Sequence, residues 1–163
     1  VVHWNGRILN WLNDDDINKG VTSSELYDYL GIDSVTNYNW GGCADFDGEY
    51  ADVTEDYLKN LAGEAEKISV PYYPNISVGW DNNVRFYDFM PGVVRNNPPE
   101  LFKDACEKVK AFADESMKNG IMKAPFITVN SWNEWTETSY LQPDDLYGYG
   151  YLEAVKKVFV DGE

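Results

Sequence analysis

The distribution of apolar and polar positions along the chain predicts an alternating series of strands and helices. Strands are predicted at 8–12, 32–38, 70–78 and 126–132, where β-branched and aromatic residues form short runs. Helices, whose apolar residues recur three and four positions apart, are predicted at 23–30, from Thr54 to about Ile68, from Pro98 to Gly120, and up to about Phe159. This alternation predicts an α/β fold of four βα units, with a parallel sheet and right-handed crossovers.

Capping residues mark the predicted helix ends. Thr22-Ser23-Ser24-Glu25 is a capping box, and Gly31 follows the last residue of the same helix. Thr54 is the predicted N-cap of the second helix, with two acidic residues in the first turn. We find no linker and no internal repeat, so residues 1–163 are interpreted as a single domain.

A cluster of polar and aromatic residues follows each predicted strand, whereas no such cluster stands at the strand starts. The clusters are Asn13-Asp14, 37–40, 80–85 and 132–137. Because the carboxyl ends of parallel strands lie at one edge of a sheet, we expect the four clusters to meet on one face. A full (β/α)8 barrel needs about 200–250 residues, so four units correspond to about half a barrel and indicate a fragment of a larger one.

The last cluster contains two glutamates three positions apart, Glu134 and Glu137. On one continuous strand they would point to opposite faces, about 10 Å apart along its axis. If the chain turns after Asn133, they converge on one cavity. Two carboxylates beside indole rings suit glycosidic bond chemistry. The alternative interpretation is a pair of solvated loop acids.

The other clusters supply candidate residues for contact with a carbohydrate. Aromatic rings can stack on a sugar, and amide, carboxylate and guanidinium groups can form hydrogen bonds with its hydroxyls. The alternatives are ordinary turns rich in Asn and Gly, and a structural Asp–Arg pair over a packed indole. The candidates are Asn37, Tyr38, Trp40, Trp80, Asp81, Arg85, Trp132, Asn133 and Trp135.

Charge and composition exclude several classes of partner. The formal net charge is −15, which argues against nucleic acid and against anionic membrane surfaces, because both require a cationic protein surface. Aromatic residues make up 15% of the chain, enough for a core and a ligand surface made of rings. No apolar run approaches the length of a membrane span, and no signal peptide is recognisable. The compartment is left open, with a secreted, periplasmic or cell-surface location favoured.

No metal or cofactor is predicted. Cys43 and Cys106 do not form a metal-binding spacing, and Cys106 shares a helical face with apolar residues, which predicts a small core residue. The run from Asp14 to Glu25 resembles a calcium loop in part. It has Lys19 where the sharp turn requires glycine, and Glu25 already belongs to the capping box, so calcium is disfavoured.

Several sequence blocks resemble a known family. The blocks 129–137, 141–143 and 147–155 resemble the C-terminal signature of the WbsX-type domains, which are similar to glycoside hydrolase family 99. The blocks 31–40 and 79–85 are similar to two upstream blocks of the same family. The resemblance covers nearly the whole chain, and it implies the C-terminal half of a (β/α)8 glycosidase barrel.

The resemblance also implies roles for the two glutamates. Family 99 members are retaining endo-α-mannosidases, with two glutamates three apart in an Asn-Glu-Trp-His-Glu block. Glu134 would then deprotonate the 2-hydroxyl of the sugar, which attacks its own anomeric carbon. Glu137 would be the general acid for the leaving oxygen and afterwards the base for water. Two departures stand out, since Thr136 replaces the histidine and Thr138 replaces a common glycine.

Other functions remain open at this point. WbsX-type members also carry a glycosyltransferase label, although nothing in the chain looks like a diphosphate cradle. The chain could instead be a non-catalytic carbohydrate-binding piece, or a half-barrel without activity of its own. Half a barrel would leave strand edges and an apolar inner face uncovered, so we expect either a homo-oligomer or an N-terminal half-barrel from a longer polypeptide.

Overall fold

The computed structural model describes residues 2–3, 23–66 and 68–162. The strand predicted at 8–12 and the cluster Asn13-Asp14 lie outside the described residues. The same holds for most of the calcium-like run from Asp14 to Glu25. The α/β class is confirmed, because helices alternate with short strands that pair mostly in parallel.

The main strands pair in parallel around one central strand segment. β1 (Val2–His3) pairs with β2 (Val35–Thr36), and β2 pairs with β4 (Tyr72–Tyr73). Beyond Pro74, the same chain segment continues as β5 (Asn75–Ser77), which pairs in parallel with β7 (Thr128–Asn130). The strands predicted at 32–38, 70–78 and 126–132 are therefore present in their predicted order, although each ladder is only two or three residues long.

A contact across the central segment shows that these strands are strongly curved. The Oγ1 atoms of Thr36 on β2 and Thr128 on β7 are 2.8 Å apart. β2 and β7 pair with opposite sides of the β4–β5 segment, so in a flat sheet they would be separated by about 9–10 Å. Asn75 lies between them and donates to Thr128 Oγ1 at 2.9 Å. The polar face that these three residues share is therefore concave.

Four helices are described, and three of them match their predicted ranges closely. They are α2 (Ser23–Leu30), α3 (Tyr50–Glu66), α4 (Pro99–Lys118) and α5 (Gly150–Lys156), which continues as a π-helical turn, η4 (Lys157–Asp161). The prediction for the start of α3 was wrong, since α3 begins at Tyr50, one turn before Thr54. Thr54 donates from Oγ1 to the Tyr50 carbonyl at 2.7 Å, so it is an interior residue and not a cap.

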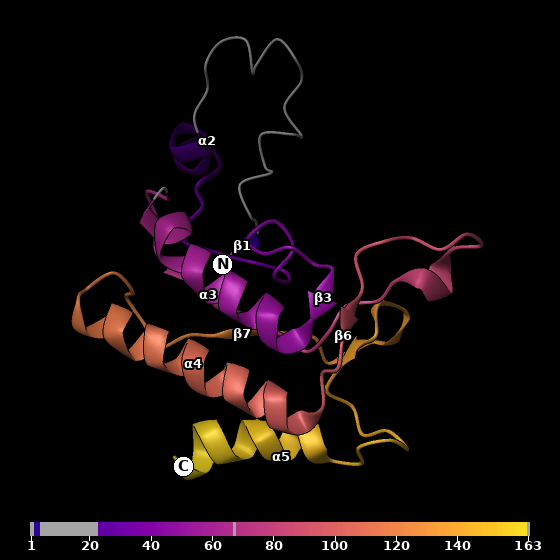
Figure 1. Ribbon diagram of the computed structural model, residues 1–163. Helices are drawn as coiled ribbons and strands as arrows, with labels where there is room; N and C mark the ends of the chain where they lie inside the picture. The colour runs from indigo at the N-terminus through magenta and orange to yellow at the C-terminus, as the bar shows by residue number, and fades with distance from the viewer. Residues whose placement is uncertain (1, 4–22, 67, 163) are drawn as a thin grey trace.

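Short elements occupy the loops that follow the strands. β3 (Gly48–Glu49) pairs in parallel with β6 (Val94–Arg95), and β8 (Asn133–Glu134) pairs antiparallel with β9 (Ser139–Tyr140). Two 3₁₀ turns, η2 (Asn83–Arg85) and η3 (Trp135–Glu137), contact each other. The segment between β5 and β6, which carries η2, projects from the body of the molecule (Figure 1).

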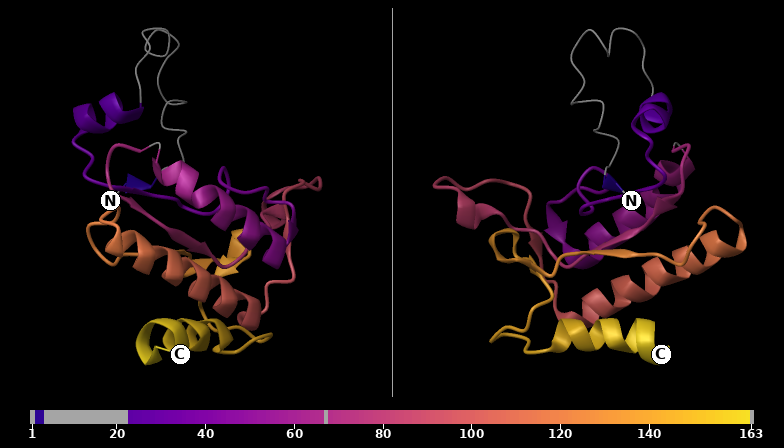
Figure 2. Two further views of the ribbon diagram at one scale, coloured as in Figure 1. Left: turned by 60° about the vertical axis from the view of Figure 1, so that its left-hand side comes forward. Right: turned by 180° about the vertical axis from the view of Figure 1, so that it is seen from behind.

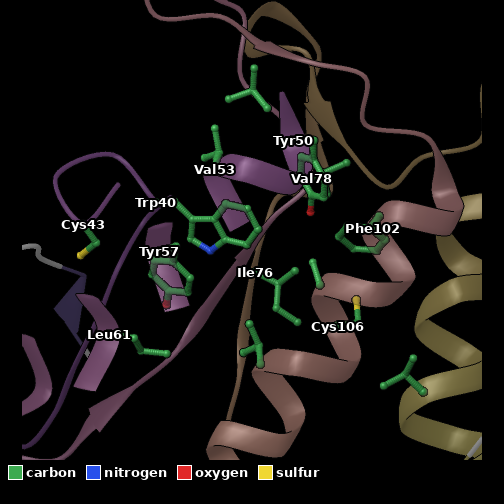
Figure 3. Packing of buried hydrophobic residues seen from close by; sticks show 14 of the residues in the cluster. Trp40, Cys43, Tyr50, Val53, Tyr57, Leu61, Ile76, Val78, Phe102 and Cys106 are labelled. Atoms are coloured by element: carbon green, nitrogen blue, oxygen red, sulfur yellow. The ribbon is translucent and has the colours of Figure 1, made fainter. Parts of the chain in front are cut away.

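The core lies between the helices and the face of β5 that points toward them. α4 lies beside α5 and also contacts α3 and β5 (Figures 1 and 2). Trp40 stacks on Tyr57, with 5.0 Å between ring centroids, and Ile76 packs in the same cluster (Figure 3). Cys106 is 0% exposed within this cluster, which confirms its prediction as a core residue. This core supports the loops that carry the candidate site.

Candidate functional site

Four side chains from three different loops form one hydrogen-bonded group, which we call the carboxylate cluster. Tyr38 follows β2, Arg85 lies in η2 after β5, and Glu134 and Glu137 follow β7. Each of these segments comes after a strand of the parallel set, as the sequence predicted. The structure therefore brings together residues that are up to 99 positions apart along the chain.

Arg85 is the centre of the carboxylate cluster. Its Nη1 donates to Oε1 of Glu137 at 2.9 Å, and its Nη2 donates to Oε2 of Glu134 at 3.2 Å. Its Nε donates to Oγ1 of Thr136 at 2.8 Å. The planar guanidinium group matches carboxylate geometry, and its single positive charge contacts both carboxylates. The guanidinium group of Arg85 thus holds both glutamates.

The two glutamates have different surroundings. The side chain of Glu137 is 8% exposed, and its Oε2 accepts a hydrogen bond from the Tyr38 hydroxyl at 2.7 Å. Both of its carboxylate oxygens therefore accept from a donor. The side chain of Glu134 is 42% exposed and has the longer contact with Arg85. One carboxylate is anchored below the surface and the other is open to a ligand.

The chain turns sharply between the two glutamates, which is why they converge. β8 ends at Glu134, η3 follows, and Thr138 adopts a left-handed conformation with φ of 51°. A threonine in this region is strained. It is held by its Oγ1, which donates to the Asp81 carbonyl, and by its N–H, which donates to the Trp135 carbonyl. The replacement of the family's common glycine thus falls at a position with positive φ.

Burial and a neighbouring charge act on Tyr38. Desolvation by partial burial and, after it, the hydrogen bond and negative charge of Glu137 together raise the pKa of Tyr38 to about 12. The phenol therefore keeps its proton over the whole physiological range. It serves as a permanent hydrogen-bond donor to the Glu137 carboxylate.

Several predicted binding residues surround the carboxylate cluster at the surface. Trp132 and Trp135 are 53% and 45% exposed, and Asn133 between them is exposed as well. Trp135 stacks on Tyr140, with 3.7 Å between ring centroids, and its indole N–H donates to Gln142 Oε1 at 2.7 Å. These exposed rings offer flat surfaces next to the glutamates.

Two predicted binding residues make structural contacts: Asp81 within the loops of the site, and Trp80 with Phe46. Asp81 accepts from the backbone N–H of Asn83 at 2.9 Å and from its side-chain amide at 2.7 Å, which fixes the start of η2. Its own N–H donates to the Glu137 carbonyl at 2.8 Å. Trp80 is half-buried and stacks on Phe46, with 5.6 Å between ring centroids. Asp81 thus stabilises the conformation of the loops and is not itself a member of the carboxylate cluster.

The structure corrects the prediction for Asn37 and Trp40, which lie in the core. Trp40 is 0% exposed, and its indole N–H donates to the Asn75 carbonyl at 2.9 Å. Asn37 is 2% exposed, donates to Cys43 Sγ at 3.0 Å and accepts from the Tyr72 hydroxyl. Asn37 follows β2 directly, and Trp40 stacks on Tyr57 of α3, so neither the amide nor the ring reaches a ligand surface.

Sequence reasoning missed some residues that shape the site. Ser131 holds the loop, since its Oγ donates to the Ser139 carbonyl at 2.7 Å and accepts from the Glu134 N–H at 3.1 Å. Thr136 was noted only as a departure, yet it binds Arg85. Tyr140 and Gln142 support Trp135 from outside the predicted cluster. The available signal for Ser131 and Thr136 was their place in the same sequence block as the two glutamates.

Within residues 23–66 and 68–162, no group of three or more His, Cys, Asp or Glu side chains converges in a way that could hold a metal ion. In the same part of the chain, no helix is both long and apolar enough to cross a membrane.

Together, the α/β fold and the paired carboxylates beside exposed indoles are typical of carbohydrate-related proteins. The sequence profile of the family described as "Glycosyltransferase WbsX" matches residues 15–155, and the chain belongs to this family. The resemblance to WbsX-type domains is therefore confirmed.

Two curated relatives from Xanthomonas campestris pv. campestris also match. Both are called "Uncharacterized protein WxcX", one from strain ATCC 33913 and one from strain B100. Each is 26% identical to this chain over 121 residues, which is 69% of this chain and 15% of the relative. The chain thus spans only a small part of the length of these relatives.

Proposed function

We propose that this chain carries the catalytic face of a glycoside hydrolase that cleaves a mannose-type polysaccharide or glycan. The observation that carries the proposal is the shared contact of Arg85 with Glu134 and Glu137, which places two carboxylates in one site. Membership of the WbsX family supports a glycan-related role. The choice of hydrolysis, and the roles of the individual residues, are our own inference.

In the proposed reaction, Glu134 takes the proton of the sugar 2-hydroxyl. The resulting alkoxide oxygen bonds to the anomeric carbon of the same sugar while the bond to the leaving oxygen breaks. Glu137 gives a proton to that leaving oxygen, and its carboxylate then takes a proton from the water that opens the cyclic intermediate. The proton held by Glu134 returns to the 2-oxygen, so the sugar ends as a hydrolysed product with its hydroxyls restored.

The surroundings of the two glutamates suit these two different roles in proton transfer. Glu134 is open to solvent and can meet a sugar hydroxyl, whereas Glu137 is buried among donors that keep its position fixed. Tyr38 holds Oε2 of Glu137 and Arg85 holds Oε1. We propose that the incoming sugar shifts Arg85 toward Glu134, which frees Oε1 of Glu137 for a proton.

Exposed rings are the proposed sugar platforms. Trp132 and Trp135 lie next to the two glutamates in the same loop, and Trp80 is half-buried. Stacking of a sugar's C–H face on an aromatic ring contributes binding without selecting one hydroxyl pattern. Asn133, which is exposed between the two indoles, is the proposed hydrogen-bonding partner for a sugar hydroxyl.

We further propose that the strands are part of a (β/α)8 barrel. The contact between Thr36 and Thr128 supports this, because barrel interiors are filled by layers of side chains from alternate strands. An apolar hollow of about 310 Å³ beside β7, lined by residues that include Phe126 and Phe159, supports it as well. The proposed occupant of this side is an N-terminal half-barrel from a longer polypeptide, in line with the much greater length of the relatives.

A second candidate function, glycosyl transfer, is favoured by the family description alone. The two functions differ in what they require. A transferase consumes an activated sugar donor such as a nucleotide sugar, whereas a hydrolase releases reducing ends from a glycan in water. Incubation of the full-length protein with mannose-type polysaccharides, with and without nucleotide sugars, separates them. Release of reducing ends without any nucleotide sugar supports our proposal, and strict dependence on the donor contradicts it.

A further inference from the structure

A projecting segment with exposed apolar side chains adjoins the carboxylate cluster. This segment, residues 81–93, lies between β5 and β6, carries η2 and extends away from the body of the molecule (Figures 1 and 2). We call it the arm. All of its residues from 84 to 91 are exposed, and the exposed fraction reaches 104% at Tyr87 and 75% at Phe89. Its large apolar residues are Val84, Phe86, Tyr87, Phe89 and Met90. Such a concentration of exposed apolar side chains marks a site of interaction.

Hydrogen bonds at its base hold the arm in shape. The side chain of Asn83 pairs with the backbone of Met90 at two points, since Oδ1 accepts from the Met90 N–H at 2.7 Å and Nδ2 donates to the Met90 carbonyl at 3.0 Å. Further back, the Val94 N–H donates to the Trp80 carbonyl at 2.8 Å. Residues 84–89 therefore form a closed loop. A loop that is already ordered loses less conformational entropy when its side chains bind a ligand.

Arg85 connects the arm to the candidate site. It lies in η2, within the arm, and its guanidinium group binds both Glu134 and Glu137. An extended chain advances by at most about 3.6 Å per residue, so the Cα atoms of Tyr87 and Phe89 lie within about 7 Å and about 14 Å of the Arg85 Cα atom. A glycan of several units that has one unit at the carboxylate cluster can therefore extend to the arm.

The chemistry of the arm fits a neutral glycan. Aromatic rings stack on the C–H faces of sugars without any need for charge. Of the charged side chains of the arm, Arg85 already binds the two glutamates, and Asp81 accepts from the Asn83 amide at 2.7 Å. The formal net charge of −15 disfavours an anionic lipid surface as the occupant. A protein partner is the alternative that the experiments below distinguish.

We propose that Tyr87 and Phe89 form an outer sugar subsite, which binds a unit of the glycan away from the bond that is cleaved. This inference rests on the proposed function, because it assigns the arm to the same glycan substrate. It adds that the protein selects long chains over short ones. Neither ring touches the reacting atoms in this account, so both act on binding and not on the chemical step.

Binding of two ligands of different length tests the outer subsite without catalysis. Calorimetric titration uses the full-length protein with Glu134→Gln, so that the ligand stays uncut, and compares a soluble α-mannan with α-mannobiose. In the double variant Tyr87→Ala and Phe89→Ala, we expect the Kd for α-mannan to rise about tenfold, because two stacking rings are lost. The Kd for α-mannobiose should stay within about twofold. Equal losses for both ligands would overturn the outer position of the subsite.

Two matched variants control this comparison. Exchange of the two rings, Tyr87→Phe with Phe89→Tyr, keeps both stacking surfaces and should leave the Kd for α-mannan within about twofold. Tyr29→Ala changes an 86% exposed tyrosine on α2 and should have no effect on α-mannan binding. Because Tyr87 and Phe89 are exposed, thermal unfolding of the double alanine variant should match that of the parent protein. A Kd that rises as much in the ring exchange as in the double alanine variant would overturn stacking as the mode of binding.

Kinetics in the protein with both glutamates intact test the separation of binding from chemistry. The double alanine variant should raise KM for α-mannan about tenfold and leave kcat within about twofold. If the wild type binds α-mannan but does not cleave it, the proposed function fails, and the titration still decides the role of the arm. Wild type that does not bind α-mannan would overturn the inference. An unchanged Kd for α-mannan, with a changed mass in light scattering, would identify the arm as a protein contact and would also overturn it.

Discussion

The hydroxyl group of Tyr38 donates a 2.7 Å hydrogen bond to Oε2 of Glu137, although the two residues are 99 positions apart. The contact joins the loop after β2 to the loop after β7 and closes the carboxylate cluster on one side. Arg85 closes it on the other side. The result is a buried carboxylate whose two oxygens both accept from fixed donors.

This contact predicts a change in the titration of Tyr38. The pKa of Tyr38 is raised to about 12 by burial and by the hydrogen bond and charge of Glu137. Glu137→Gln removes the charge, so the pKa of Tyr38 should fall toward the ordinary value of about 10 for tyrosine. Carbon-13 resonances of ring-labelled tyrosine, assigned with Tyr38→Phe, measure it. A Tyr38 pKa that stays near 12 in Glu137→Gln would show that burial alone causes the shift.

Arg85 should matter far more than an arginine in a similar but exposed set of ion pairs. Arg85→Gln leaves the buried Glu137 carboxylate without its cation, so we expect a loss of about 1–3 kcal/mol of unfolding free energy. The matched control is Arg95→Gln, because Arg95 also contacts two carboxylates, Asp47 and Glu49, at the surface. Urea unfolding measures both variants. The cluster would not be a structural unit if Arg85→Gln and Arg95→Gln had the same small effect.

The two tryptophans Trp40 and Trp135 should behave in opposite ways. Trp40 is fully buried, so Trp40→Ala should cost about 3–5 kcal/mol of stability. Trp135 is 45% exposed, so Trp135→Ala should leave the fold nearly intact and weaken binding of a mannose-type oligosaccharide. Thermal unfolding and calorimetric titration measure these effects. Unchanged oligosaccharide affinity in Trp135→Ala would remove Trp135 from the proposed binding set.

The uncovered side of β7 should cause self-association when the chain is alone. Phe159, which is 37% exposed, borders the apolar hollow beside Phe126. Packing of this hollow against a second copy of the chain would remove apolar surface from water. Light scattering of the 163-residue chain at moderate salt, where the −15 charge is screened, should show oligomers that Phe159→Gln weakens. The control Tyr29→Gln, at an 86% exposed residue of α2, should have no effect. A monomer under all conditions would contradict the half-barrel proposal.

The order of elements was predictable because local patterns determine it. The apolar stripe and the first-turn proline of α4 lie within one short stretch of the sequence, and α4 indeed runs from Pro99 to Lys118. The capping box and Gly31 likewise mark α2 correctly. The start of α3 was missed because Thr54 uses its hydroxyl for the carbonyl one turn back, a choice that depends on the packing of Tyr50 and not on the cap pattern.

The site was predictable in its residue types but not in its contacts. Glu134, Glu137, Tyr38 and Arg85 were named from clusters that follow strands, and the structure joins all four. Trp40 was misplaced because an indole after a strand looks the same in sequence whether it faces a ligand or the core. Only the curvature of the strands and the position of α3 decide which it does, and both depend on residues distant in the chain.

The central claim is that Glu134 and Glu137 together cleave a glycan. Release of reducing ends from a mannose-type polysaccharide by the full-length protein tests it most directly, with Glu134→Gln, Glu137→Gln and, as a control on α4, the exposed Glu115→Gln. We expect Glu134→Gln and Glu137→Gln each to lower kcat by about 10²-fold or more. A bound oligosaccharide should still protect both variants from thermal unfolding. The control Glu115→Gln should match wild type. Wild-type turnover in the double variant of Glu134 and Glu137 would contradict the account.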